Sequence, residues 1–153
     1  MDRRNAIGAG IAASLGGLLL AGNAAAADGH EHHHHAQAKP GGPHKHAALL
    51  EGTTNCLRAG EICHAECLRV LATGDKDMAA CAVTVSDMLA TCDALLKLAA
   101  ADSRHLPKMA ALAAAVCDDC EKECRKHEKM HSECRQCAEA CVECARACRK
   151  VAA

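Results

Sequence analysis

Residues 117–148 read CDDCEKECRKHEKMHSECRQCAEACVECARAC and hold eight of the thirteen cysteines in this chain. Within this stretch, most cysteines follow one another at steps of three or four residues. An α-helix turns by about 100° per residue, so such steps return each cysteine to the same helix face. The intervening residues are mostly Glu, Lys, Arg, Asp and Ala, which suit a face in contact with water. The stretch therefore predicts helices in which cysteine occupies the buried positions that leucine usually takes.

The composition of the whole chain narrows the choice of fold and partner. With 153 residues and no Phe, Tyr or Trp, the chain is long enough for one domain whose core consists of Ala, Leu, Val, Met and Cys. Its formal net charge of -1 leaves no basic surface that could hold nucleic acid or an anionic membrane by counterion release. We therefore expect one small all-helical domain that binds neither.

Residues 1–27 have the pattern of an export signal. Arg3 and Arg4 precede a weakly apolar stretch, and the four alanines that end at Ala27 suit an A-x-A cleavage site. The segment resembles a twin-arginine signal, although Asp2 stands where that class prefers Ser or Thr, so the general secretory route stays open. A short membrane anchor is disfavoured because four glycines interrupt the apolar run. We predict that the mature protein is exported, periplasmic and free of the membrane.

Residues 28–46 are rich in histidine and contain Pro40, Gly41, Gly42 and Pro43. Such a composition cannot form a packed core, so we predict a disordered tail outside the fold. Histidine-rich tracts bind divalent metals through imidazole, but a polar spacer without a binding role has the same composition. Both interpretations of the tail remain open.

Residues 47–153 are predicted to form a helical domain of four segments. Gly74 is expected to end the first segment, Asp75 to cap the second, and Asp102 or Ser103 to cap the third. Residues at inward steps of three or four are Leu49, Thr53, Cys56, Gly60, Cys63, Cys67 and Val70, then Met78, Cys81, Val85, Met88, Cys92, Leu95 and Ala99, then Leu106, Ala110, Ala113, Cys117, Cys120 and Cys124, and finally Cys134, Cys137, Cys141, Cys144 and Cys148.

The boundary between the third and fourth segments carries neither Gly nor Pro. A continuous helix over residues 104–151 would be roughly 70 Å long, about twice the length of the other two. We therefore place a reversal near residues 129–132, with Ser132 as the cap of the last helix. The predicted fold is all-α, an antiparallel up-down-up-down four-helix bundle with a cysteine-lined core; a three-helix form or an interlocked dimer is the alternative.

The two ends of this bundle differ in chemistry. One end, here called the mouth, has the possible ligands Met78, His127, Met130 and His131; the two histidines could instead be polar caps. The other, here called the aliphatic end, has Leu49, Leu95, Ala99, Leu106 and Val151. The thirteen candidate metal ligands fill the length between them: Cys56, Cys63, Cys67, Cys81, Cys92, Cys117, Cys120, Cys124, Cys134, Cys137, Cys141, Cys144 and Cys148. Met88, far from the mouth, is expected to be core packing rather than a metal ligand, the less favoured alternative, because methionine fills irregular gaps.

Thiolate and thioether ligands select Cu(I), zinc or iron–sulfur clusters. We expect a rod of sulfur along helices not to sort into closed four-cysteine zinc sites, and iron–sulfur clusters use cysteines on loops. Cu(I) needs only two or three sulfurs, and cysteines four residues apart on one helix provide pairs at 63/67, 120/124, 137/141 and 144/148. One Cu(I) per thiolate would also leave a buried core nearly neutral. The pattern therefore predicts several Cu(I) ions per chain.

The cysteine steps from Cys56 to Cys148, together with the twin-arginine-like segment, resemble the exported copper storage proteins of bacteria. The resemblance implies storage of many Cu(I) ions inside each bundle, uptake at one end past Met and His residues, and a homotetramer. It also implies exchange of copper with donor or acceptor proteins, which the sequence does not identify, and no enzymatic activity.

Two other functions remain open. A structural bundle stapled by disulfides is one, although an odd number of cysteines leaves one unpaired within a chain. A zinc or cadmium thiolate buffer is the other. A redox enzyme is disfavoured, because we expect no CxxC motif at a turn-to-helix junction, where the thiol pKa is lowered.

Overall fold

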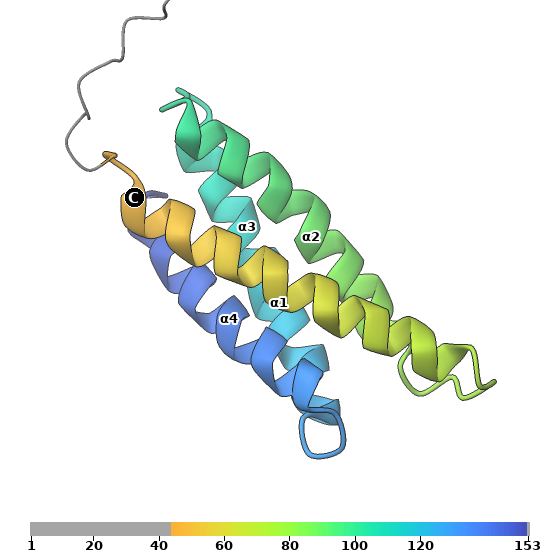
Figure 1. Ribbon diagram of the computed structural model, residues 1–153. Helices are drawn as coiled ribbons and strands as arrows, with labels where there is room; N and C mark the ends of the chain where they lie inside the picture. Colours follow the sequence, from red (N-terminus) through yellow and green to blue (C-terminus); the bar gives the residue numbers. More distant parts are fainter. Residues whose placement is uncertain (1–43, 153) are drawn as a thin grey trace, which may run out of the picture. The chain divides into compact units, whose positions relative to one another are not determined.

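The protein, analysed as a computed structural model, is described over residues 44–152. The predicted export signal, and the histidine-rich tail up to Pro43, lie outside the described residues. The helices are α1 (Ala47–Leu71), α2 (Ala79–Ala100), α3 (Leu106–His127) and α4 (Ser132–Arg149). Each helix packs against two neighbours, since α1 contacts α2 and α4, and α3 contacts the same two helices (Figure 1). The predicted all-α, up-down-up-down four-helix bundle is confirmed.

The turn from α1 to α2 bears out one expectation and corrects another. Gly74 follows α1 with a φ of 89°, a left-handed conformation that glycine adopts without steric cost, and its amide donates to the Leu71 carbonyl. Asp75 does not cap α2, whose first flanking residue is Met78. The Asp75 carboxylate instead accepts a hydrogen bond from the amide of Asp77 at 2.9 Å. This hydrogen bond closes the turn before the helix begins.

At the end of α2, Asp102 has a φ of 45°. The Ser103 amide donates to the Leu98 carbonyl at 3.0 Å and the Asp102 amide to the Ala99 carbonyl at 3.2 Å. This is the Schellman pattern, with an aspartate at the left-handed position where glycine is usual. Asp102 therefore terminates α2 rather than capping α3.

The start of α1 is held to the α2–α3 turn by the same aspartate. Its carboxylate binds Lys45 Nζ at 3.0 Å and His46 Nε2 at 2.8 Å. Ser103 does not cap α3 either, because the flanking residue is His105; the Ser103 hydroxyl accepts a hydrogen bond from the His105 amide in the turn that leads into the helix. Pro107 lies in the first turn of α3, where its missing amide hydrogen costs little.

The α3–α4 reversal lies where it was predicted. The amides of Met130 and His131 both donate to the His127 carbonyl, at 3.1 and 2.9 Å. His131 then takes an extended conformation, so α4 begins at Ser132. The residue that flanks the start of α4 is thus His131 rather than Ser132. The Ser132 hydroxyl donates a hydrogen bond to the Glu133 carboxylate and accepts none from the helix amides.

The predicted inward residues form the core. Their side chains are buried, apart from Val70, which packs against the core from its edge.

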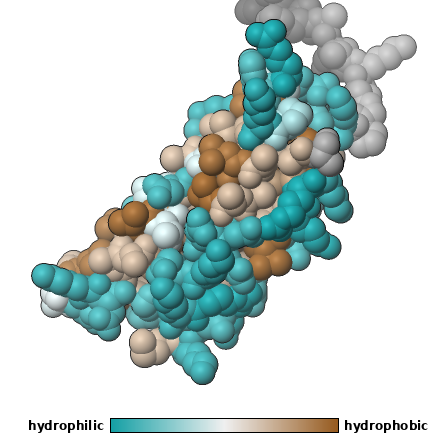
Figure 2. Space-filling model, turned by 180° about the vertical axis from the view of Figure 1, so that it is seen from behind, coloured by the Kyte–Doolittle hydropathy of each residue, from teal (hydrophilic) through white to brown (hydrophobic). Residues whose placement is uncertain are grey.

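Among the described helices, α2 is long and apolar enough to cross a membrane by length and composition alone, a test that the core helix of a bundle also passes. Apolar side chains also reach the surface, such as Val83 on α2 and Leu112 on α3, and Figure 2 shows hydrophobic areas between more hydrophilic ones.

Candidate metal-binding core

All thirteen cysteines are fully buried free thiols inside the bundle. They come from all four helices, because each helix turns a cysteine-bearing stripe toward the common axis. Neutral thiols are small and weakly polar, so a core of this kind packs as other small apolar residues do. The sequence analysis placed every one of these residues on the correct face.

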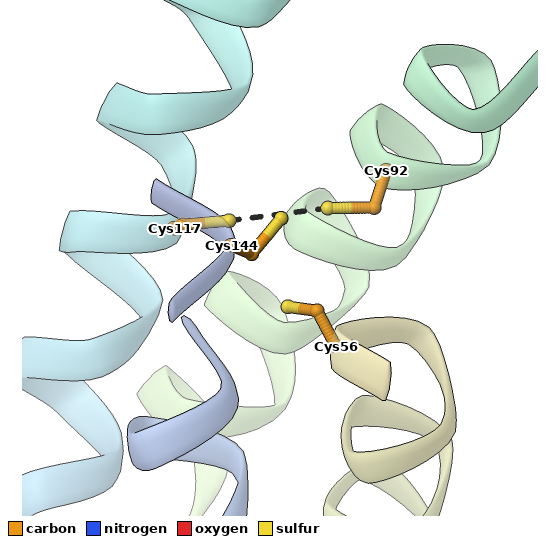
Figure 3. A group of neighbouring side chains, drawn as sticks. All are labelled: Cys56, Cys92, Cys117 and Cys144. Atoms are coloured by element: carbon orange, nitrogen blue, oxygen red, sulfur yellow. Dashed lines mark hydrogen bonds between the residues drawn. The ribbon is translucent and has the colours of Figure 1, made fainter. Parts of the chain in front are cut away.

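One set of sulfur atoms contains a residue from each helix. Cys56, Cys92, Cys117 and Cys144 point toward one another, and their sulfurs all lie within 4.8 Å (Figure 3). We call these residues the inner group. The Cys92 and Cys117 sulfurs are 3.9 Å apart. A metal lies about 2.3 Å from a thiolate sulfur, so sulfurs up to about 4.6 Å apart can share one ion.

A second set lies nearer the mouth, and we call it the outer group. Its sulfurs, also within 4.8 Å of one another, belong to Cys63, Cys67, Cys81 and Cys134. The expectation that the thiols would not sort into four-cysteine groups is therefore wrong. Cysteine side chains are short, so those at one level of a square bundle meet at its axis from several helices.

Two smaller sets connect the inner and outer groups. One consists of Cys63, Cys124 and Cys137, and the other of Cys120, Cys137 and Cys141. Cys63 also belongs to the outer group, and Cys141 lies 3.8 Å from Cys56 of the inner group. The sulfur atoms thus form a continuous series along the bundle axis.

The pairs predicted along single helices take part in this series. The 63/67 and 137/141 pairs each fall within one set, and the 120/124 sulfurs are 4.0 Å apart. Cys148 belongs to none of the sets, but its thiol interacts with that of Cys144. Beside Cys144 also lies Thr53, whose hydroxyl is 3.9 Å from the sulfur and donates to the Leu49 carbonyl.

The thiols of one group do not hold their protons equally. Hydrogen bonding, first with Cys141 and then with Cys56 and Cys92, lowers the pKa of Cys117 to about 6. The pKa of Cys92 is raised, first by Cys117 and then by Cys144 and Cys56, and further by burial. A buried group can stabilise one thiolate with the S–H donors around it, whereas a second negative charge would be unfavourable. A first metal ion would therefore displace a proton from Cys117 or Cys144 more easily than from Cys92.

The four predicted mouth residues occupy different environments. Met78 is buried at the start of α2, and His127 is partly buried at the end of α3. His131 lies in the α3–α4 turn with a side chain 19% exposed. Met130, in the same turn, is 77% exposed, so the structure does not bring it together with the cysteines.

Glu66 is a neighbour of the mouth that the sequence analysis missed. Its carboxylate, 13% exposed, accepts two hydrogen bonds from Arg69 at 2.7 and 2.6 Å and lies 3.0 Å from His131 Nδ1. Arg69, and then His131, lower the pKa of this carboxyl. A carboxylate on one imidazole nitrogen is the usual partner of a metal-binding histidine, since it orients the ring and leaves the other nitrogen free. The only sequence signal was the three-residue Glu66–Arg69 spacing.

One CxxC motif contradicts the expectation for the redox alternative. Cys134 and Cys137 form such a motif in the first turns of α4, and the pKa of Cys134 is lowered, first by hydrogen bonding with Cys124. The expectation was wrong although the start of α4 was predicted, because a helix that begins near Ser132 already has Cys134 in its first turn. Both thiols are nevertheless fully buried, whereas reactive cysteines of redox enzymes are partly exposed.

No cysteine is exposed at the aliphatic end. Leu49, Leu95, Ala99 and Leu106 are buried there, and Val151 is partly buried. A surface depression of about 610 Å³ lies at this end, and it is lined by charged, polar and aliphatic residues without a cysteine or methionine.

Comparison with known proteins identifies the family. A family model described as copper storage protein (Csp) matches residues 43–153. The chain belongs to the copper storage protein family. The cysteine-rich protein YhjQ of Bacillus subtilis (strain 168), described as uncharacterized, is 31% identical to this family member over 106 residues, covering 69% of this chain and 94% of YhjQ.

Solved structures of this family have a similar fold. The apo form of copper storage protein 3 from Bacillus subtilis is 31% identical, with a TM-score of 0.61 over 69% of this chain and 97% of that one. A cytosolic copper storage protein from Streptomyces lividans, with five coppers, is 29% identical, with a TM-score of 0.63 over 70% and 91% of the two chains. The protein Ccsp of the same organism, loaded with 10 copper equivalents, is 30% identical, with a TM-score of 0.63 over 76% and 91%.

Proposed function

We propose that this protein stores several Cu(I) ions as thiolate complexes inside its bundle, without catalysing a reaction, and releases them to copper-requiring proteins. The observation that carries the proposal is the continuous series of thirteen buried thiols along the bundle axis. Family membership supports it, since solved relatives are described as bound to or loaded with copper.

The arrangement of the thiols favours Cu(I) over zinc. Zinc in the inner and outer four-cysteine groups would use eight thiols, leave five of the thirteen without an ion, and bury a net charge of about -2 at each site. Cu(I) binds with two or three sulfurs, so it can use the smaller sets and the shared residues Cys63 and Cys137 as well. One Cu(I) per thiolate also leaves the core nearly neutral.

Anaerobic titration with Cu(I) tests this proposal. We expect saturation at roughly one ion per cysteine, because each thiolate can bridge two ions while each ion takes two thiolates. Saturation near two zinc or cadmium ions, with no further Cu(I) uptake, would instead support the thiolate buffer. Titration of free thiols in the anaerobically purified apo protein would reveal the disulfide-stapled bundle, for which few reactive thiols would be found.

We also propose that copper enters at the mouth. Thioether and imidazole hold Cu(I) less tightly than thiolate, so ligand strength would increase from the mouth toward the outer group. At the aliphatic end, no cysteine or methionine lines the surface depression, and the imidazole that does, His46, is already paired with Asp102. Replacement of the four mouth residues by Ala or Leu should slow Cu(I) uptake and removal in stopped-flow experiments while capacity stays nearly unchanged; the residues are Met78, His127, Met130 and His131.

A pair of cysteine variants provides the matched control for the mouth experiment. Replacing Cys137 and Cys141 by Ser should lower the copper capacity and leave the initial uptake rate nearly unchanged. If the mouth variant exchanged copper at the rate of the unaltered protein, uptake at this end would be ruled out.

The proposed domain organisation is an export signal over residues 1–27, a histidine-rich tail over 28–46 and the storage domain over 47–153; contrary to expectation, residues 44–46 of the tail contact the bundle. The family match begins at residue 43, so the signal lies outside it, and one solved relative is cytosolic. Cell fractionation of the chain, with Arg3 and Arg4 both replaced by Lys, would test twin-arginine export to the periplasm. Sedimentation of the processed protein would test the proposed homotetramer.

A further inference from the structure

Met88 lies in the middle of α2 with its side chain fully buried. Its thioether sulfur accepts a hydrogen bond from the Cys56 thiol at 3.4 Å. The Cys56 sulfur is in turn 3.8 Å from that of Cys141. A third soft donor therefore lies next to one thiol of this pair, at a depth where the sequence analysis favoured packing over metal binding.

This contact lies where two of the cysteine sets in the sulfur series meet. Cys56 belongs to the inner group, whereas Cys141 belongs to the set with Cys120 and Cys137. Copper can move between the inner group and the rest of the core through this point, because Cys56 and Cys141 provide a direct sulfur contact between the two.

The facing helix leaves room for the methionine side chain. Gly60 is an inward residue of α1, and a Cβ built there would overlap with Met88 Cε and lie 3.0 Å from Leu89 Cδ2. Glycine in the middle of a helix is unfavourable compared with alanine. The methyl group of Met88 thus occupies the space that a side chain at position 60 of α1 would otherwise fill. The sulfur of Met88 faces Cys56.

We propose that the Met88 thioether is the third ligand of a Cu(I) ion held by Cys56 and Cys141. This inference rests on the proposed function. On binding, the ion displaces one proton from each thiol, both protons pass to the solvent, and no electron is transferred. The neutral thioether adds a soft donor without adding negative charge to the buried core. As the weakest of the three ligands, it can detach and let the ion pass between the inner group and the neighbouring set.

Selenium absorption spectroscopy tests this ligand directly. Met78, Met109 and Met130 are replaced by Leu, and the full chain is produced with selenomethionine and loaded with Cu(I). Selenium–copper scattering at bonding distance is expected, and it should disappear when Met88→Leu is added. Full copper loading without such scattering would overturn the inference alone. A protein that binds no copper would overturn the proposed function, and the measured copper content separates the two outcomes.

Exchange kinetics in the otherwise unaltered protein give a second readout. Leucine keeps the volume of methionine, so Met88→Leu should keep the copper capacity and the unfolding midpoint of the apo form. Removal of copper by an external chelator should become several-fold slower in its last phase, when the inner group empties. Met109→Leu is the matched control, since Met109 packs at the edge of the core, and it should behave as the unaltered protein does. Equal last phases in both variants would exclude a role in transfer.

Discussion

The copper-free bundle should lose stability as the pH rises above about 9, whereas the copper-loaded bundle should keep it. The prediction rests on four thiols: Cys63, Cys92, Cys141 and Cys148. Hydrogen bonds with neighbouring thiols raise the pKa of each of them, and burial raises it further. In the unfolded chain the same thiols have their ordinary pKa of 9.0.

The sign and size of the effect follow from proton linkage. Above about pH 9 the unfolded thiol releases its proton while the folded thiol keeps it, so the stability present below this pH is progressively lost. Between about pH 9 and 10 each such thiol lowers the free energy of unfolding by about 1 kcal/mol, and the four together by about 4 kcal/mol, before the smaller opposite contribution of thiols with a lowered pKa, such as Cys117 and Cys134. This is a large part of the roughly 5–15 kcal/mol that stabilises a small domain. Bound copper has already replaced these protons, so the loaded form should show no such loss.

Anaerobic urea unfolding at about pH 8, 9 and 10, followed by far-ultraviolet circular dichroism, measures the effect. Cys148→Ala is a suitable variant because Cys148 lies outside the three- and four-cysteine sets. It should reduce the alkaline loss by about 1 kcal/mol. An apo protein with the same free energy of unfolding at about pH 9 and 10 would refute the reasoning.

Three further substitutions test the packing, the first turn and the mouth. Leu95→Ala should lower the free energy of unfolding by about 2–5 kcal/mol in urea denaturation, since Leu95 is fully buried at the aliphatic end. Gly74→Ala should cost about 1–2 kcal/mol in thermal unfolding, because its φ of 89° is unfavourable for alanine although nothing would touch the new Cβ. Glu66→Gln should slow Cu(I) uptake in stopped-flow measurements at unchanged capacity, because the amide holds His131 less firmly; equal rates would argue against this role.

The sequence alone determined the fold class and the face of each helix. Helical periodicity is a local property, so a step of three or four residues was enough to place all thirteen cysteines inside. The α3–α4 reversal could also be predicted, since helices of one bundle have comparable lengths. The predicted caps of α2, α3 and α4 were wrong because a polar side chain at a turn can bind several nearby groups, and the backbone geometry selects among them.

Which side chains meet across the bundle was decided only by the tertiary structure. The level at which two cysteines face each other depends on the rotation and axial shift of their helices, and a shift of one residue is enough to change a sulfur's neighbours. The four-cysteine groups, the Glu66–His131 contact across 65 residues and the Met88–Cys56 contact across 32 residues all depend on such shifts. Periodicity tells which residues turn inward, but it carries no information about what lies opposite them.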